Sequence, residues 1–343
     1  FRHRFGRAPQ GLWLPEAGVD NETLSVMADH GIEFTILAPW QADTWDLDPT
    51  EPYRVALPNG RSIVAFFYHR DLSGRVSFDA ALTSNADAFA MNDLRRHFQN
   101  EKASRDEPQL LLVASDGELY GHHQPFRDYF LAHLLKNASA QIGITPTYPA
   151  RWLREHPPRR TIKIRDNTSW SCHHGVVRWL GNCDCAGGQG HWKWPLRHAL
   201  DQLAARLDHV YDDVVRPMID DPWELRNRYI HVVLGEQTLG DLVGEMAGRR
   251  LDVATVERIA LLLEMQRERQ RMFTSCGWFF DDFDRIEPKN NVAYAAQAVR
   301  LAERATGADL AAETRAWLQQ VVSWRSGIRG DQVFDQHMQY LEA

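Results

Sequence analysis

The sequence predicts an α/β region followed by an α-helical region, and three observations support this prediction. Short apolar segments alternate with helix-like segments over residues 1–150. An irregular stretch over 151–195 is rich in tryptophan, histidine, cysteine and glycine. From there to residue 343, the apolar residues mostly recur with the 3.6-residue period of amphipathic helices. A chain of 343 residues has room for two domains, which we place at 1–150 and 151–343.

Four apolar segments of the first domain are expected to be strands, and three polar-apolar segments between or after them are expected to be helices. Apolar strands separated by helices are typical of parallel sheets that are covered on both faces, as in a β/α barrel or a doubly wound sheet. The expected strands are 11–14, 33–37, 61–67 and 109–114, and the expected helices are 21–30 (with Asp20 as its N-cap), 84–100 and 120–137.

The second domain is predicted to be a helical domain or bundle. Its clearest pattern is at 200–214, where apolar residues fall on one stripe of a helix. Less regular patterns of the same kind occupy 252–272, 292–306 and 308–322.

Composition excludes several classes of partner. The chain has 39 basic and 46 acidic side chains, a net charge of −7, which argues against a nucleic-acid partner. Its apolar runs are far shorter than the roughly 20 residues that span a bilayer, so no membrane partner is expected. Four cysteines are too few for a disulfide scaffold and favour a reducing, cytoplasmic location. The chain begins at Phe1 without a methionine, so we expect that it is N-terminally truncated.

Two of the expected strands run into acidic residues. Glu16 follows the strand at 11–14, and Asp116 and Glu118 follow the strand at 109–114. If all four strands are parallel, these acids lie at one end of the sheet, where functional residues of such folds gather. A facing pair of carboxyl groups, one ionised and one protonated, is the minimum for glycoside hydrolysis. The alternative is structural, with Glu16 in a turn and Asp116 capping a helix.

Four segments resemble glycoside hydrolase family 57, and more narrowly its branch labelled alpha-amylase/alpha-mannosidase-like, with the domain of unknown function 3536. The most specific pieces are Trp-Leu-Pro-Glu, ending at Glu16, and Asp-Gly-Glu-x-x-Gly-His, starting at Asp116. The resemblance covers most of the chain. The four segments are 11–42, 115–123, 169–185 and 274–282.

The resemblance implies a seven-stranded (β/α) barrel followed by a helical domain, and a retaining mechanism without a catalytic metal or cofactor. It makes Glu16 the nucleophile and Asp116 the acid/base, with Glu118 as a supporting residue behind them. The family has a His-Gln-Pro motif before its nucleophile, and nothing of this kind precedes Glu16 here. The chain is therefore expected to hold only the last four strands of the barrel. An open partial barrel of this kind would make a poor enzyme by itself.

Several residues near the predicted acids are candidates for sugar binding. Tryptophan rings stack on the apolar faces of sugars, and amide or imidazole groups can bond their hydroxyls. Each candidate has a structural alternative: core packing for the aromatic residues, a loop amide for the glutamine, and solvated or capping roles for the histidines. The candidates are Trp13, Trp40, Gln41, His122, His123, Trp170, Trp278 and Asp281.

A cluster of cysteine and histidine residues leaves three alternatives open. Thiolate and imidazole groups at this density could hold a structural zinc ion, but the cysteine spacing lacks the paired C-x2-C of typical zinc sites. We therefore favour no metal, with a structural metal or a disulfide as the alternatives. The cluster comprises Cys172, His173, His174, Cys183, Cys185 and His191.

The function that we predict is a retaining glycoside hydrolase for α-linked glucan, an α-mannoside or a related polysaccharide. The same two acids would run a transglycosylase or branching reaction if a sugar, rather than water, were the acceptor. Two other classes stay open. One is a carbohydrate-binding protein without turnover. The other is a metal-dependent deacetylase-like enzyme, which would need an Asp-Asp or His-x3-His signature that the sequence does not show near the strand ends.

Overall fold

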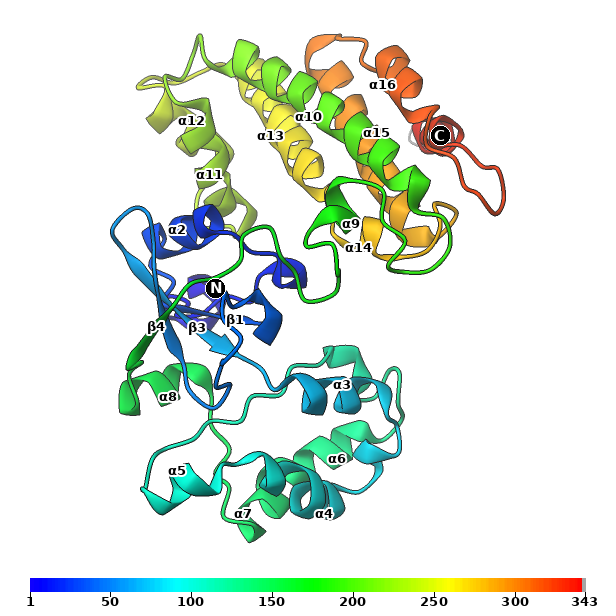
Figure 1. Ribbon diagram of the computed structural model, residues 1–343. Coiled ribbons are helices and arrows are strands. Elements are labelled where there is room, and N and C mark those ends of the chain that lie inside the picture. The colour runs from blue at the N-terminus through cyan, green and yellow to red at the C-terminus, as the bar shows by residue number, and fades with distance from the viewer. Residues whose placement is uncertain (341–343) are drawn as a thin grey trace. The chain divides into compact units, whose positions relative to one another are not determined.

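The computed structural model describes residues 1–340 and divides into two compact units, which meet in sequence between Ser171 and Cys172 (Figure 1). We expected the boundary at residue 150. It lies later because the segment after it still pairs with the first unit: a strand at 160–162 joins the sheet, and Thr168 forms an antiparallel bridge with Val19.

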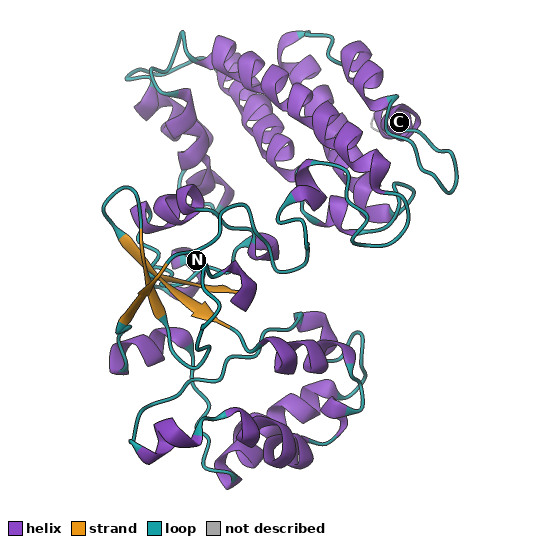
Figure 2. Ribbon diagram, viewed as in Figure 1, coloured by secondary structure: helices purple, strands orange, loops and turns teal. Residues whose placement is uncertain are grey.

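The first unit contains a mixed sheet of four short strands in the order β1-β3-β2-β4 (Figure 2). β1 pairs in parallel with β3, β3 is antiparallel to β2, and β4 is parallel to β2. The sheet is open, and it is not the all-parallel set that we expected. The strands are β1 (Phe34–Leu37), β2 (Tyr53–Ala56), β3 (Ser62–Phe67) and β4 (Arg160–Ile162).

Two of the four expected strands, those at 33–37 and 61–67, are confirmed as β1 and β3. The expected strand at 11–14 is wrong, because only Gly11 bridges β1 before Pro15 turns the chain into a short 3-10 helix. Gly11 can approach this closely because it lacks a Cβ, which would lie 2.1 Å from the ring of Phe34. The expected Trp-Leu-Pro-Glu strand end is therefore a turn.

The expected strand at 109–114 is an extended segment outside the sheet. Its hydrogen bonds go to different kinds of partner, so no ladder forms. The carbonyl of Leu112 accepts from the backbone of His69 at 2.8 Å, and the N–H of Ala114 donates to the hydroxyl of Ser73 at 3.0 Å. The segment is thus fixed against the residues that follow β3.

The predicted helix at 21–30 is confirmed as α2, where Asp20 caps the N–H of Thr23 at 2.7 Å. The predicted helices at 84–100 and 120–137 are interrupted by 3-10 and π turns. The α-helices of the first unit are α1 (Arg2–Phe5), α2 (Asn21–Asp29), α3 (Arg70–Phe78), α4 (Ala86–Phe89), α5 (Asn100–Ser104), α6 (Arg127–His133), α7 (Ser139–Gln141) and α8 (Pro149–Glu155). Its 3-10 turns are η1 (Pro15–Ala17), η2 (Pro39–Gln41), η3 (Leu82–Ser84), η5 (Arg95–His97) and η6 (Gly117–Leu119), and its π turns are η4 (Ala90–Leu94) and η7 (Leu134–Ala138).

The second unit is helical, as predicted, and its core lies among α10, α13 and α15 (Figure 1). Leu200, Leu203, Leu207 and Tyr211 of the predicted stripe are fully buried. Within residues 1–340, no helix is both long and apolar enough to cross a membrane. The helices are α9 (Val177–Leu180), η8 (Gly190–Trp192), α10 (Lys193–Val215), α11 (Pro222–Val233), α12 (Leu239–Met246), α13 (Val253–Arg271), α14 (Cys276–Phe279), α15 (Ile286–Thr306), α16 (Ala311–Leu318) and α17 (Gly330–Tyr340).

The structure predicts a pH dependence of stability at His69, the N-cap of α3. Its Nδ1 accepts a hydrogen bond from the N–H of Leu72 at 3.2 Å, which requires an unprotonated nitrogen. Burial lowers the pKa of His69, although Asp71 opposes this effect. The ring of His97 lies 4.1 Å from that of His69, and burial lowers the pKa of His97 as well. A histidine in the unfolded chain has a pKa of about 6.5, so the free energy of unfolding should fall as the pH drops below that value.

His69→Asn keeps a capping acceptor but cannot titrate. Urea unfolding at a series of pH values should therefore show a smaller loss of stability between about pH 7 and pH 5 for the variant than for the wild type. Equal losses in both proteins would contradict the assignment.

Candidate functional site

The backbone of Glu16 is strained. Glu16 and Ala17 have φ angles of +56° and +47°, so two consecutive residues with side chains adopt the left-handed conformation. This conformation costs about 1 kcal/mol or more for each such residue, so the surroundings must enforce it. Strained backbone of this kind concentrates at functional sites.

Gln41 and the segment around Trp170 hold this turn. The side-chain amide of Gln41 donates to the carbonyl of Ala17 at 2.7 Å, and its oxygen accepts from the N–H of Ala38 at 2.8 Å. The backbone N–H of Trp170 donates to the carbonyl of Glu16 at 3.0 Å. Gln41 is fully buried, so the expected contact between its amide and a sugar hydroxyl is wrong. Its role is to brace the turn.

The carboxylate of Glu16 is also held from the segment at 170–171. Its Oε2 accepts two hydrogen bonds, one from the indole Nε1 of Trp170 at 3.1 Å and one from the hydroxyl of Ser171 at 3.0 Å. The carboxylate is therefore fixed in one orientation at a half-buried position. Preorganised acids of this kind suit chemistry that depends on the position of one oxygen.

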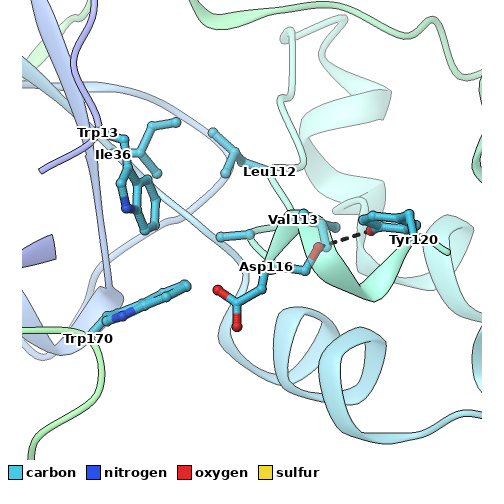
Figure 3. A pocket seen from close by; sticks show the side chains of 10 residues that line it. Trp13, Ile36, Leu112, Val113, Asp116, Tyr120 and Trp170 are labelled. Carbon is cyan, nitrogen blue, oxygen red and sulfur yellow. Dashed lines mark hydrogen bonds between the residues drawn. The ribbon is translucent and has the colours of Figure 1, made fainter. Parts of the chain in front are cut away.

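A cavity of about 520 Å³ opens beside this turn (Figure 3). Trp13 and Trp170 stand on one side of it, edge to face, with ring centroids 4.9 Å apart. Asp116 and Val113 lie on the other side, and the carboxylate of Asp116 is on the side of the cavity nearer Trp170. Most of the lining is apolar or aromatic. Besides Asp116, it includes Trp13, Ile36, Leu112, Val113, Tyr120 and Trp170.

Asp116 reaches the cavity from the end of the extended segment at 109–114. It is exposed and directly precedes η6. Tyr120 stabilises this corner, because its hydroxyl lies 2.9 Å from the hydroxyl of Ser115. Glu118 is exposed and does not line the cavity. Its backbone carbonyl accepts hydrogen bonds from the N–H groups of His122 and His123.

Of the predicted sugar-binding residues, only Trp13 and Trp170 line the cavity, and Trp40, His122 and His123 of the same unit do not. The Nε1 of Trp40 donates to the carbonyl of Ser169 at 2.9 Å, and the Trp40 ring packs edge to face on Tyr68 at 6.1 Å. Tyr68 in turn packs on Trp170, so Trp40 supports the cavity wall indirectly, through Tyr68 and Trp170. His122 and His123 are exposed, and their rings contact each other with centroids 4.9 Å apart.

Trp278 and Asp281 belong to the second unit. Trp278 is only 2% exposed, and its Nε1 donates to the carbonyl of Lys193 at 3.2 Å. The expectation that its ring leans over a substrate is wrong, because the ring is packed in the helical core. Asp281 forms an ion pair with Arg325.

No pattern in the sequence indicates Ser171 or the brace by Gln41. Ser171 lies 155 residues from Glu16, and no spacing rule connects a serine to a carboxylate over that distance. Tyr68 was missed because it follows an apolar strand and reads as core; it is indeed buried.

One group of side chains within residues 1–340 has the arrangement of a metal site, and it lies in the second unit. Cys172, His174, Cys183 and Cys185 place their ligand atoms within 4.8 Å of one another. Burial raises the pKa of Cys183 to about 11. Burial also tends to raise the pKa of Cys185, but hydrogen bonds to Cys183, Cys172 and His174 outweigh it and lower this pKa to about 6.

Each of the two parts of the chain matches a family model. Residues 1–165 match the family model of glycosyl hydrolase family 57, and residues 189–340 match that of a domain of unknown function, DUF3536. The match to family 57 covers most of the first unit. No curated protein matches the sequence.

Solved structures share the fold of this chain at low sequence identity. An exo-type maltose-forming amylase from Pyrococcus sp. ST04 matches with a TM-score of 0.75 and 16% identity, over 97% of this chain and 65% of that one. Branching enzymes from Pyrococcus horikoshii and Thermococcus kodakaraensis match with TM-scores of 0.58 and 0.56, each at 15% identity and over 98% of this chain. This chain spans 65% and 64% of those two proteins.

The brace by Gln41 is testable through stability. Gln41→Leu leaves the carbonyl of Ala17 and the N–H of Ala38 buried without these partners, which should lower the free energy of unfolding by roughly 1–3 kcal/mol. Urea unfolding followed by tryptophan fluorescence measures this loss. Gln141→Leu, at an exposed position of α7, is the matched control and should change stability by less than about 0.5 kcal/mol. Equal effects of the two substitutions would contradict the brace.

Proposed function

We propose that this protein is a retaining glycosidase that acts on α-linked glucan or a related polysaccharide. The match to family 57 supports the reaction class. One observation carries the proposal: the indole of Trp170 donates a hydrogen bond to the carboxylate of Glu16, and the same side chain lines the cavity that Asp116 also lines. A fixed carboxylate, an exposed acid and aromatic walls are thereby joined in one unit.

In this proposal Glu16 is the nucleophile and Asp116 the acid/base. Glu16 attacks the anomeric carbon, and Asp116 gives a proton to the departing glycosidic oxygen, which leaves a covalent glycosyl-enzyme. Asp116 then takes a proton from the acceptor as the acceptor displaces Glu16. Trp13 and Trp170 would stack on the sugar rings, because their faces match the apolar C–H faces of a pyranose.

The acceptor decides between hydrolysis and transfer. With water as acceptor the protein is a hydrolase, and with a sugar hydroxyl it is a transglycosylase or branching enzyme. The likeness to solved structures of both an amylase and branching enzymes makes transfer the second candidate. A carbohydrate-binding protein without turnover is the third, and the variants below separate it from the first two.

We expect Glu16→Gln and Asp116→Asn to abolish turnover of amylose and maltooligosaccharides by the natural full-length protein. Loss of either acid should lower kcat/KM by roughly 10³-fold or more, because both act on the same bond. Glucan affinity, measured by calorimetry, should change by less than about tenfold, since shape and stacking remain. Glu118→Gln, an exposed acid two residues from Asp116, is the matched control and should keep most of the activity.

Full activity of Glu16→Gln would overturn the assignment of the nucleophile. Glucan binding by the wild type with no turnover would instead favour the binding protein.

The retaining mechanism can be tested separately, through the anomeric configuration of the first products. Proton NMR during the first turnovers should show products released as the α-anomer, because two displacements restore the configuration of an α-linked substrate. In the same experiment, transfer would appear as new glycosidic linkages without a matching rise in reducing ends. Initial release of the β-anomer would contradict Glu16 as a covalent nucleophile.

A further inference from the structure

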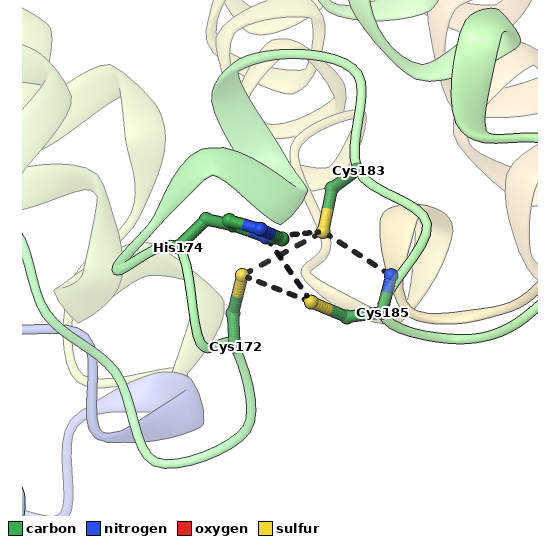
Figure 4. Close-up of side chains that lie close together, drawn as sticks. All are labelled: Cys172, His174, Cys183 and Cys185. Atoms are coloured by element: carbon green, nitrogen blue, oxygen red, sulfur yellow. Dashed lines mark hydrogen bonds between the residues drawn. The ribbon is translucent and has the colours of Figure 1, made fainter.

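Four potential metal ligands converge near the start of the second unit (Figure 4). Cys172 Sγ lies 3.6 Å from Cys183 Sγ and 3.8 Å from Cys185 Sγ. The Nδ1 of His174 lies 3.7 Å from Cys183 Sγ and 3.3 Å from Cys185 Sγ. The sulfur separations are well beyond the roughly 2.05 Å of a disulfide bond, so no disulfide joins Cys172 to Cys183 or Cys185.

These separations match four of the six ligand–ligand separations of a tetrahedral zinc site. Zinc binds thiolate sulfur at about 2.3 Å and imidazole nitrogen at about 2.0 Å. Tetrahedral angles then place two sulfurs about 3.8 Å apart, and a sulfur and a nitrogen about 3.5 Å apart. The four separations above lie within 0.2 Å of these values.

The backbone around the cluster is built to hold this arrangement. The N–H of Cys185 points to the sulfur of Cys183 at 3.5 Å, a contact that favours a negative charge on that sulfur. Gly190 closes the loop over Cys183: a Cβ at this position would lie 2.3 Å from the Cys183 carbonyl. The N–H of Gly190 donates to the carboxylate of Asp184 at 2.7 Å, which fixes the loop from its other end.

A buried lysine at the start of α10 is compatible with an anionic centre at the cluster. Lys193, the first residue of α10, is 1% exposed, and its Nζ has no hydrogen-bond partner among the residues that the structure describes. Burial lowers the pKa of Lys193, and the thiolate forms of Cys183, Cys185 and Cys172 oppose this effect. Three thiolates and one imidazole around a divalent cation carry a net charge of −1, which Lys193 offsets. A buried lysine is otherwise expensive.

We infer that Cys172, His174, Cys183 and Cys185 form a structural zinc site. The protein supplies all four ligands, and such a closed coordination shell marks structural rather than catalytic zinc. The site joins two segments of the irregular stretch that precedes α10, residues 172–174 and residues 183–185. The expectation that this cluster holds no metal rested on the missing C-x2-C pairs. The fold instead joins a C-x-H pair to a C-x-C pair. This inference does not depend on the proposed function.

Metal analysis of the natural full-length protein, purified under reducing conditions from zinc-supplemented medium, tests the inference. Inductively coupled plasma mass spectrometry should give about one zinc ion per chain. Cys183→Ser and Cys185→Ser should each reduce this content at least about fivefold. Cys276→Ser removes an exposed thiol outside the cluster and should leave the zinc content unchanged.

Three further measurements test the inference even if a ligand variant fails to fold. His174→Cys supplies a fourth thiolate and should retain the metal, because Cys₄ sites also bind zinc. In the wild type, cobalt(II) put in place of zinc should give the intense visible absorption of tetrahedral thiolate coordination. A thiol reagent should modify only Cys276 in the zinc form of the folded chain, and all four cysteines after chelation and unfolding.

Three results would overturn the inference: reduced wild-type protein without zinc, iron in place of zinc at the site, or full zinc content in Cys183→Ser. A disulfide between Cys172 and Cys183, found by mass spectrometry in freshly purified protein, would also do so.

Discussion

The left-handed backbone at Glu16 and Ala17 is the constraint on which the candidate site depends. Two adjacent side-chain-bearing residues in this conformation are unfavourable, and the fold sustains them by fixing both neighbouring carbonyls. Gln41, from the turn after β1, holds one carbonyl, and Trp170 holds the other. The same Trp170 orients the Glu16 carboxylate through its indole nitrogen. The sheet therefore acts mainly as a frame that brings these two distant segments to one turn.

The other half of the site is attached to the same frame by different means. Asp116 stands at the end of an extended segment that is fixed through His69 and Ser73, just beyond β3. Since β3 pairs with β1, and Gln41 follows β1, both acids are positioned from neighbouring strand ends. A closed barrel is not needed for this arrangement, which is why an open sheet still presents an aromatic cavity with an acid in it.

Local pattern in the sequence predicted β1, β3, α2 and the long helices of the second unit, because their apolar spacing agrees with their burial. The pattern was misleading at 109–114. This apolar run forms hydrogen bonds with His69, just after β3, and with the hydroxyl of Ser73, and it does not pair with a strand. The two motifs identified Glu16 and Asp116 as candidates. The brace by Gln41 and the donor Ser171 depend on contacts between residues 24 and 155 positions apart, which no local pattern records.

The most direct test of the account is chemical trapping of the nucleophile in the natural full-length protein. A 5-fluoro-α-glucosyl fluoride should inactivate the protein slowly and leave one sugar on each chain. The fluorine at C5 slows both steps, while the fluoride leaving group keeps formation of the glycosyl-enzyme faster than its breakdown. Peptide mass spectrometry should locate the label on Glu16, whose carboxylate the turn presents. A label on Asp116, Glu118 or any other carboxylate would contradict the account.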